Sequence, residues 1–253
     1  MLQSLGVSKK YQQKIILDEV TLTIPSQQLT AFIGANGAGK STLLGIMSRL
    51  ISKEEGNVLI DERDVTQWKS RALAQKLAIL KQSNHVSARL SVADLVAFGR
   101  FPYSQGRLTA VDQQKIDEAL AYMEITSLKN AYLDELSGGQ QQRVYIAMII
   151  AQDTEYVLLD EPLNNLDMKH AVQMMKILRR LVDEFGKTIV IVLHDINFAS
   201  AYADYMVGLK DGKVVAQGDT ESMMTTEMLK LVYDMPLAIT EVNSCKYCLY
   251  FKE

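Results

Sequence analysis

The chain has 253 residues, 48% of them hydrophobic, which is enough for one large domain or for a core with a subdomain. Its formal net charge is −3 and no basic run stands out, so nucleic acid is not expected as the main partner. The longest apolar runs are far shorter than the roughly 20 residues of a membrane-spanning helix, and the N-terminus lacks the apolar core of a signal peptide. We therefore expect a cytosolic chain that only another protein would hold at a membrane.

The first elements are predicted to be β-strands, because apolar and polar residues alternate there. KIILDEVTLTIP, residues 14–25, is predicted to form a pair of strands, and residues 52–68 are predicted to form short strands joined by turns. Tyr11 precedes the first of these segments, and its ring can stack on an adenine base. Because exposed tyrosines are common, this residue alone indicates little.

The segment GANGAGKST, residues 34–42, matches the phosphate-loop pattern G-x-x-x-x-G-K-[ST]. It follows the apolar strand LTAFI and precedes an apolar helix, which is the context that the motif requires, so a chance glycine turn is the poorer explanation. Successive backbone N–H groups and the start of the helix favour a bound phosphate. Lys40 is expected to reach the β- and γ-phosphates, and the Ser41 hydroxyl to bind Mg²⁺. The predicted nucleotide-binding residues of the loop are Gly34, Ala35, Asn36, Gly37, Ala38, Gly39, Lys40, Ser41 and Thr42.

The middle of the chain changes to a helical pattern. Just before it, Gln82 follows the apolar segment LAIL, where a neutral amide can contact Mg²⁺ or an attacking water, although the residue alone is weak evidence. Residues 91–134 are predicted to be mainly helical, with Thr109 and Asp112 as a capping box at one helix start. The apolar face of that helix is predicted to comprise Ile116, Leu120 and Met123.

A second set of bare glycine amides occurs about a hundred residues after the first. LSGGQ, residues 136–140, runs directly into QQRVYIAMIIAQ, which is predicted to be helical. A helix that starts with glycines exposes its first N–H groups, and such a start binds anions. The chain therefore has two predicted anion-binding helix starts, of which one phosphate loop explains only the first.

The segment YVLLDEP, residues 156–162, is an apolar strand that ends in two carboxylates. Asp160 is suited to hold Mg²⁺, directly or through water. Glu161 is predicted to lie at the carboxyl edge of the sheet, where it can polarise a water for attack on the γ-phosphate. Acidic turns are common, so this pair becomes strong evidence only because the phosphate loop is present.

The next two segments are predicted to complete the core. Residues 168–185 form an amphipathic helix that Gly186 ends at the C′ position. KTIVIVLHD then contains a fully apolar strand, as expected in a parallel sheet covered on both faces. His194 ends this strand at the same sheet edge as Glu161, where it could contact the γ-phosphate; a structural turn residue is the alternative.

A predicted hairpin, the two cysteines and the other two histidines are not expected to take part in the chemistry. Asp211–Gly212 between two apolar segments indicates a β-hairpin. Cys245 and Cys248 lie on a predicted strand, where residues three apart point to opposite faces, and no second cysteine pair accompanies them. We therefore expect two ordinary thiols in a reducing compartment. His85 is predicted in a loop and His170 on a helix surface.

The order of these elements predicts an α/β fold with an N-terminal antiparallel β subdomain and an inserted α-helical subdomain. We expect a single domain over residues 1–253. Its α/β catalytic core with the β subdomain comprises residues 1–90 and 135–253, and the helical subdomain comprises about 91–134.

The motifs stand in the order found in ATP-binding cassette ATPases, and the chain resembles this family over essentially its whole length. The resemblance rests on GANGAGKST, Gln82, LSGGQ, YVLLDEP, NNLD and His194, of which LSGGQ is highly specific. It implies a P-loop NTPase (RecA-like) core that binds ATP and Mg²⁺ and hydrolyses ATP. It also implies a head-to-tail homodimer, in which LSGGQ of one subunit caps the γ-phosphate held by the other.

The resemblance assigns roles to individual residues. Tyr11 matches the residue that stacks on adenine, Asp167 the aspartate that crosses the dimer interface, and Gln82 the glutamine that couples nucleotide to transporter. The capping residues are Ser137, Gly138, Gly139 and Gln140, the catalytic residues Glu161, His194 and Gln82, and the metal ligands Ser41, Gln82 and Asp160. The chain departs from the pattern at Asn164 and Asn165, where many members have Ser or Thr, which puts the hydrogen bonds of this turn in question.

Softer similarities favour importers of iron–siderophore complexes, haem or cobalamin, and among them bacterial ferric-siderophore uptake ATPases. They lie in residues 91–103, in LDMKHAVQMMKILRRL and in GDTESMMTTEMLKLVYDMPL. Such a subunit is a peripheral protein on the cytoplasmic face of the membrane, held by two permease subunits that a substrate-binding protein serves from outside. Arg100, Phe101 and Tyr103 are candidates for the permease contact, unless Phe101 and Tyr103 pack inside the helical subdomain.

Two other classes of protein are alternatives to the importer. Among non-transport cassette ATPases, repair proteins insert long coiled coils and translation proteins carry two cassettes, and this chain has neither feature. Iron–sulfur assembly ATPases have a single cassette and remain the main alternative. A GTPase-like switch would need a guanine-binding N-K-x-D sequence, which is absent, and would leave LSGGQ unexplained.

Overall fold

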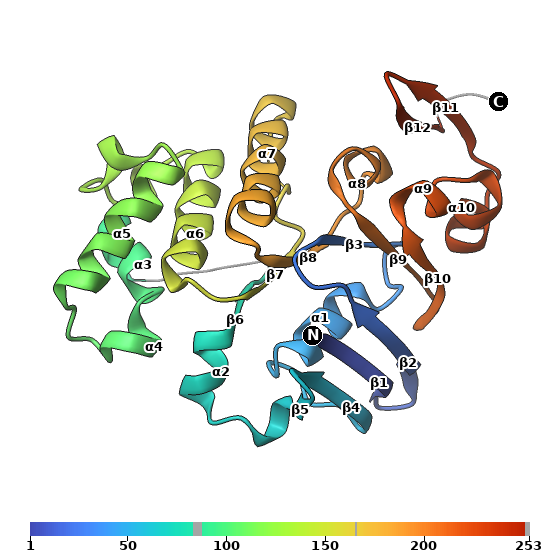
Figure 1. The fold of residues 1–253 in the computed structure, drawn as a ribbon, viewed down its shortest axis with the longest axis horizontal. Coiled ribbons are helices and arrows are strands. Elements are labelled where there is room, and N and C mark those ends of the chain that lie inside the picture. The colour runs from blue at the N-terminus through green and yellow to red at the C-terminus, as the bar shows by residue number, and fades with distance from the viewer. Residues whose placement is uncertain (83–87, 165, 251–253) are drawn as a thin grey trace. The chain divides into compact units, whose positions relative to one another are not determined.

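The computed structural model describes residues 1–82, 88–164 and 166–250, which form two compact units (Figure 1). The first unit comprises Met1–Trp68 and Leu181–Glu253, and the second comprises Lys69–Arg180. The second unit contains the whole predicted helical subdomain and extends beyond it at both ends, so the predicted subdomain boundaries stay predictions. Within the described ranges, no helix combines the length and the apolar character needed to cross a bilayer.

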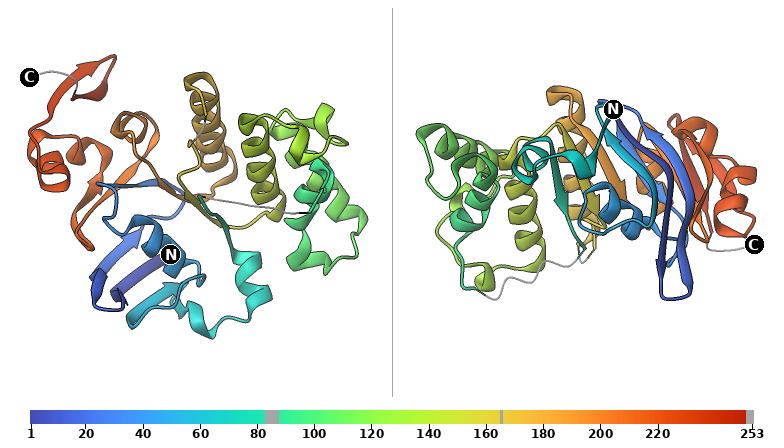
Figure 2. Two further views of the ribbon diagram at one scale, coloured as in Figure 1. Left: turned by 180° about the vertical axis from the view of Figure 1, so that it is seen from behind. Right: turned by 90° about the horizontal axis from the view of Figure 1, so that it is seen from below.

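The N-terminal part of the first unit is an antiparallel sheet with the strand order β2-β1-β4-β5 (Figure 2, blue and cyan strands). Its strands are β1 (Leu2–Tyr11), β2 (Lys14–Ile24), β4 (Glu55–Ile60) and β5 (Arg63–Asp64). The prediction of two strands within residues 14–25 is wrong, because this segment is the single strand β2 and pairs with the residues before it. Glu19 adopts a φ of 49°, so the strand is bent by an irregularity in its pairing without being interrupted.

The rest of the first unit is built around four strands, three of them parallel. β3 (Leu29–Ile33) lies between β8 (Thr188–Val192) and β9 (Tyr205–Lys210) and is parallel to both, while β10 (Lys213–Asp219) returns antiparallel to β9. Every residue of β3 and β8 is buried, which confirms the predicted parallel core. The hairpin predicted at Asp211–Gly212 is also confirmed, and both residues have positive φ. The remaining elements are α1 (Lys40–Met47), α8 (Ile196–Tyr202), α9 (Thr220–Met223), α10 (Thr226–Tyr233), β11 (Ala238–Val242) and β12 (Cys245–Leu249).

The second unit joins a parallel strand pair to a group of helices. β6 (Leu77–Leu80) pairs with β7 (Tyr156–Asp160), all of whose residues are buried. The helices are α2 (Ser70–Lys76), α3 (Val92–Phe98), α4 (Phe101–Ser104), α5 (Ala110–Tyr122), α6 (Gly138–Gln152) and most of α7 (Met168–Phe185). The capping box of Thr109 and Asp112 is confirmed at the start of α5, and its predicted apolar residues are all buried. Gly186, with a φ of 61°, follows the last residue of α7 as predicted.

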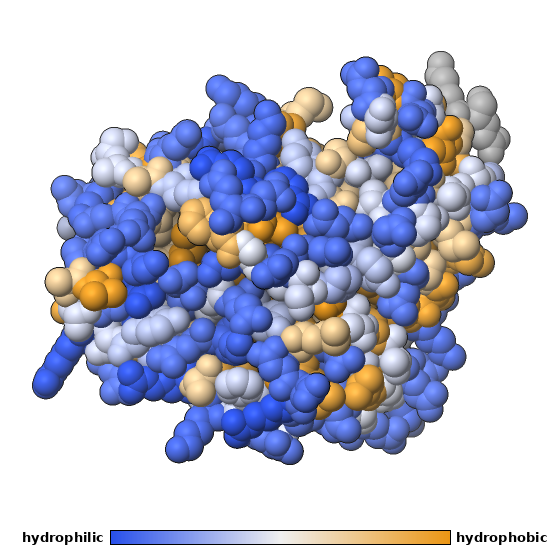
Figure 3. Space-filling view, in the orientation of Figure 1, coloured by the Kyte–Doolittle hydropathy of each residue, from blue (hydrophilic) through white to orange (hydrophobic). Residues whose placement is uncertain are grey.

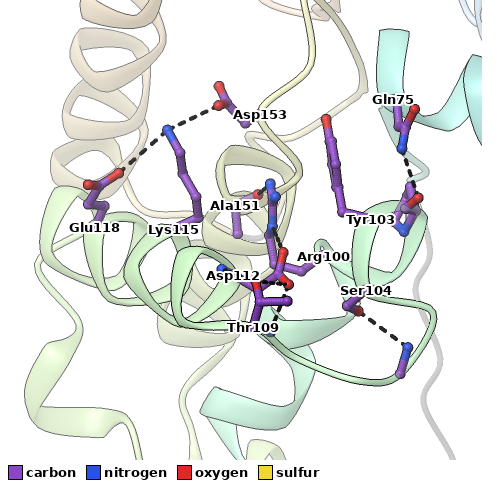
Figure 4. Close-up of polar contacts among 12 residues, drawn as sticks. Gln75, Arg100, Tyr103, Ser104, Thr109, Asp112, Lys115, Glu118, Ala151 and Asp153 are labelled. Carbon is purple, nitrogen blue, oxygen red and sulfur yellow. Dashed lines mark hydrogen bonds and ion pairs between the residues drawn. The ribbon is translucent and has the colours of Figure 1, made fainter.

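A buried ion pair ties α5 and α6 to the residue that precedes α4 (Figure 4). Arg100 Nε donates to Asp112 Oδ1 at 2.9 Å, and Arg100 Nη1 donates to the Ala151 carbonyl at 2.8 Å. The guanidinium lies 3.9 Å from the centre of the Tyr103 ring. Arg100 is only 5% exposed, so its predicted contact with a permease is wrong. The backbone N–H of Thr109, together with the Arg100 charge, lowers the pKa of Asp112.

We predict that Arg100→Ala lowers the free energy of unfolding by roughly 3 kcal/mol at neutral pH, because Asp112 would be left buried without its cation. The lowered pKa of Asp112 means that its contribution to stability is present above the unfolded-state pKa. That contribution is lost as the pH falls through the folded-state pKa, so the difference between variant and parent should shrink in acid. Urea unfolding at several pH values measures both effects.

The matched control is Arg89→Ala, because Arg89 is 63% exposed and faces Asp134 and Glu135. An exposed pair of this kind contributes between about 0 and 1 kcal/mol. Equal losses of stability in the two variants would contradict the role given to the buried pair.

Candidate nucleotide-binding site

The phosphate loop connects β3 to α1, and its glycines are required by close packing. Gly34, Gly37 and Gly39 have φ values of 137°, 82° and 101°, which favour residues without a side chain. A Cβ atom added to Gly34 would lie 2.1 Å from the Leu209 carbonyl oxygen on β9. One added to Gly39 would lie 2.8 Å from the Ile16 carbonyl oxygen on β2. The loop is therefore held in its curled form by two strands of the first unit, β2 and β9, which belong to different sheets.

Lys40 and the start of α1 face this loop. Lys40 Nζ donates to the carbonyl oxygens of Gly34 at 2.7 Å and Ala35 at 3.0 Å, and the residue is 5% exposed. Gly39, the residue that precedes α1, provides no side-chain cap for the first amides of the helix. A buried ammonium group and uncapped helix amides fit a polyphosphate. Ser41 and Thr42, which follow in the first turn, are half-buried.

The carboxylate of Glu161, in the second unit, accepts hydrogen bonds from two side-chain amides. Glu161 Oε2 accepts hydrogen bonds from Gln82 Nε2 at 2.6 Å and from Asn164 Nδ2 at 2.5 Å. The contact with Gln82 arises because β6 and β7 are parallel neighbours, so their carboxyl ends meet at one edge. Asp160, at the end of β7, is buried. Glu161 has a φ of 51°, a left-handed conformation that costs a non-glycine residue about 1 kcal/mol or more and is typical of functional turns.

Asn164 is a site residue whose contact the sequence did not reveal. The sequence marked this position only as a departure from Ser or Thr, whereas the structure shows its amide on the carboxylate of Glu161. The sequence signal for this contact is the spacing of three residues between Glu161 and Asn164. The two residues are the ends of one turn, in which the Asn164 backbone N–H donates to the Glu161 carbonyl at 3.2 Å. Asn165 lies outside the described residues.

The LSGGQ segment forms the start of α6, as predicted. Ser137 Oγ accepts from the Gln140 backbone N–H at 3.3 Å, and Gln140 Oε1 accepts from the Ser137 backbone N–H at 2.9 Å. Gln140 is thus part of a capping box. A Cβ added to Gly138 would meet no atom within 4 Å, so the first turn of α6 has an open face within its own unit.

Asp167 and His170 form a pair beside this helix start. Asp167 Oδ1 accepts from the backbone N–H of His170 at 2.8 Å and lies 2.7 Å from its ring Nδ1. These contacts, the backbone hydrogen bond first, lower the pKa of Asp167. A Cβ added to Gly139 would lie 3.9 Å from the His170 ring, which places this histidine next to the LSGGQ segment. His170 is on a helix as predicted, but it is half-buried and belongs to this cluster. His85 lies outside the described residues.

Tyr11 and His194 belong to the first unit. Tyr11 is the last residue of β1 and is 49% exposed, with Lys9 Nζ 5.1 Å from its ring centre. His194 is exposed and follows β8 after one further residue, Leu193. Ser41 also lies in this unit, whereas Gln82 and Asp160 lie in the other, so the joint set of Mg²⁺ ligands stays a prediction.

Comparisons with known proteins identify the relatives of this chain. Residues 17–164 match the family model described as ABC transporter. The chain is 55% identical to the petrobactin import ATP-binding protein YclP of Bacillus subtilis, an alignment that covers 99% of this chain and 100% of the relative. It is 48% identical to the petrobactin import ATP-binding protein FatE of Bacillus anthracis, over 92% and 94% of the two chains.

Solved structures of bacterial cassettes have the same fold. The dimeric structure of MJ0796, a bacterial ABC transporter cassette, matches with a TM-score of 0.79 and 31% identity, over 87% of this chain and 99% of that one. The post-hydrolysis state of the same cassette, bound to ADP and Pi, matches with a TM-score of 0.77. These matches confirm the α/β fold predicted from the sequence.

The contact between Asn164 and Glu161 leads to a prediction. Asn164→Ala removes one of the two amides on the carboxylate, so we expect the kcat of ATP hydrolysis to fall on the order of tenfold, with the KM for ATP little changed. Asn164→Asp places a like charge against the carboxylate, and its kcat should fall further. Steady-state phosphate release measures both variants. Asn130→Ala, at an exposed asparagine, is the control, and a parent-like kcat in Asn164→Ala would show that Asn164 does not position Glu161.

Proposed function

The chain belongs to the ABC transporter family, and from this premise we propose that it is the energy-coupling subunit of a ferric-siderophore importer. Like its relatives, it is an ATPase that converts ATP and water to ADP and phosphate. The observation that carries the choice of cargo is the full-length similarity to two petrobactin import ATP-binding proteins. The same comparison favours an importer over an iron–sulfur assembly ATPase.

The site residues divide the work of hydrolysis. We propose that the phosphate loop and Lys40 hold the β- and γ-phosphates, and that Tyr11 stacks on the adenine ring. Glu161 orients the attacking water, and His194 contacts the γ-phosphate. Mg²⁺ neutralises phosphate charge when bound, and its proposed ligands are Ser41, Gln82 and Asp160.

The open start of α6 supports a head-to-tail homodimer. Ser137 and Gln140 form a capping box within their own chain. A Cβ atom added to Gly138 would have no atom within 4 Å, so this part of the helix start is open. We propose that Ser137, Gly138, Gly139 and Gln140 of one subunit cap the γ-phosphate bound by the other subunit, and that Asp167 crosses the interface. ATP then closes the dimer because each half-site alone leaves the phosphate partly solvated.

We propose that exposed aromatic side chains of α3 and α4 receive the permease. Phe98 is 52% exposed and Phe101 is 58% exposed. Phenylalanine is usually buried, and exposed apolar side chains that lie together indicate a protein–protein contact. Arg71 Nε donates to the Pro102 carbonyl at 2.8 Å, so the backbone of α4, which carries Phe101, is held in place. This contact would hold the subunit on the cytoplasmic face of the membrane, and the substrate-binding protein would act only through the permease.

Ser137→Arg tests the capping role. A bulky cation at this helix start should abolish hydrolysis while ATP still binds, because Lys40 and its loop are unchanged. Equilibrium binding of a fluorescent ATP analogue and steady-state phosphate release distinguish these two effects. Ser127→Arg, at an exposed serine, should retain both activities. Loss of ATP binding in Ser137→Arg would instead mean that LSGGQ serves the nucleotide of its own chain.

The importer assignment is tested by capture from native membranes. A tagged Glu161→Gln subunit, held with ATP, should retain a polytopic permease after gentle solubilisation. Adding Phe101→Asp should abolish this capture, whereas adding Phe185→Asp, at an equally exposed phenylalanine, should not. Capture of a soluble scaffold without a membrane protein would move the chain to the iron–sulfur assembly class.

A further inference from the structure

The side chain of Asn197 joins α8 to the C-terminal hairpin, which consists of β11 and β12. Asn197 Nδ2 donates to the Cys248 carbonyl at 3.2 Å, and the Cys248 backbone N–H donates to Asn197 Oδ1 at 2.7 Å. One side-chain amide thus binds both backbone groups of one strand residue, as a neighbouring strand would. One turn later, Ser200 Oγ donates to the Lys246 carbonyl. The outer edge of β12 is therefore bound to α8 rather than to another strand.

The hairpin depends on these polar contacts because it buries little apolar surface. Of its described strand residues, only Cys248 is buried. Val242 and Leu249 are 51% and 52% exposed, and apolar side chains are visible at the surface near the C-terminal segment (Figure 3). A two-stranded hairpin is at best marginally stable by itself. The bonds to Asn197 and Ser200 are therefore a main anchor of the hairpin.

The same asparagine lies at the start of the helix that follows His194. Asp195 is the N-cap of α8, and its Oδ1 accepts from the backbone N–H of Asn197 at 2.8 Å. Asn197 is consequently bonded through its backbone to the residue next to His194 and through its side chain to the hairpin. Only Asp195 and Ile196 separate Asn197 from His194, so a displacement of the hairpin would be transmitted to the backbone of His194 over a short segment.

A cavity of about 280 Å³ lies beside His194. It is lined by His194, Ile196, Tyr233, Met235, Leu237 and Tyr250. Tyr250 follows the end of β12, so the hairpin reaches the same space as the imidazole.

We propose that Asn197 is a positioning residue for His194. By binding Cys248 it holds the hairpin against the first turn of α8, and this contact fixes the backbone segment from which the imidazole projects. The inference rests on the proposed function, because it takes His194 to act at the γ-phosphate. It gives the C-terminal hairpin a role in hydrolysis, although the hairpin contains no residue assigned to the nucleotide.

The test compares Asn197→Ala, His194→Ala and the double variant in steady-state ATP hydrolysis. We expect Asn197→Ala to lower kcat on the order of tenfold, with the KM for ATP changed less than about twofold. His194→Ala should lower kcat further, and the double variant should be no slower than His194→Ala, because Asn197 acts only through that histidine. If the two losses multiply instead, Asn197 has a merely structural role and the inference is overturned.

Two further variants keep the test decisive. Asn197→Asp retains the acceptor for the Cys248 N–H and loses the donor, so it should fold and show a smaller loss of kcat even if Asn197→Ala does not fold. Ser200→Ala removes the other bond to the hairpin and should leave kcat within about twofold of the parent. A loss in Ser200→Ala equal to that in Asn197→Ala would overturn the specific role of Asn197.

The inference and the proposed function can fail separately. Parent-like hydrolysis in His194→Ala would refute the role of His194 itself. A strong loss in His194→Ala with parent-like hydrolysis in Asn197→Ala and Asn197→Asp would refute only the positioning role.

Discussion

The close approach of the phosphate loop to β9 is the constraint on which the rest of the nucleotide site depends. The Leu209 carbonyl leaves no room for a side chain at position 34, and the Ile16 carbonyl of β2 leaves none at position 39, so both positions require glycine. The loop is thus fixed by two sheets before any ligand binds, which avoids much of the entropy cost of ordering it around a phosphate. Lys40, buried against the loop carbonyls, is fixed with it.

The two helix starts that the sequence predicts to bind anions differ in how their amides are capped. No side chain caps α1, so its first N–H groups remain directed at the loop that precedes it. The start of α6 is a capping box between Ser137 and Gln140, which stabilises the helix whether or not a partner is present. In the proposed dimer, the first helix start binds the chain's own nucleotide and the second caps the nucleotide of the other subunit, and these two roles have different structural requirements. The first needs a preformed loop, and the second needs a stable, exposed helix end.

Polar contacts between different elements hold parts of each unit together. In the second unit, Gln82 meets Glu161 because neighbouring parallel strands end at one edge, and Arg100 joins the helical elements through Asp112. In the first, Asn197 connects the C-terminal hairpin to the helix after His194. Arg100 and Asp112 are both buried, so either group would be costly to leave unpaired. The other two contacts restrict the positions of Glu161 and of the first turn of α8.

The sequence by itself determined the order of motifs, the strand–loop–helix around Lys40, the buried strands and the capping box at Thr109. These features depend on residues within a few positions of one another, so a local pattern contains the information. Tertiary structure alone decided that residues 14–24 form one strand and that Arg100 is buried. It also decided that Gln82, which lies 79 residues before Glu161, donates a hydrogen bond to the carboxylate of Glu161. Such contacts depend on which strand ends and helix faces meet, which local residue patterns do not encode.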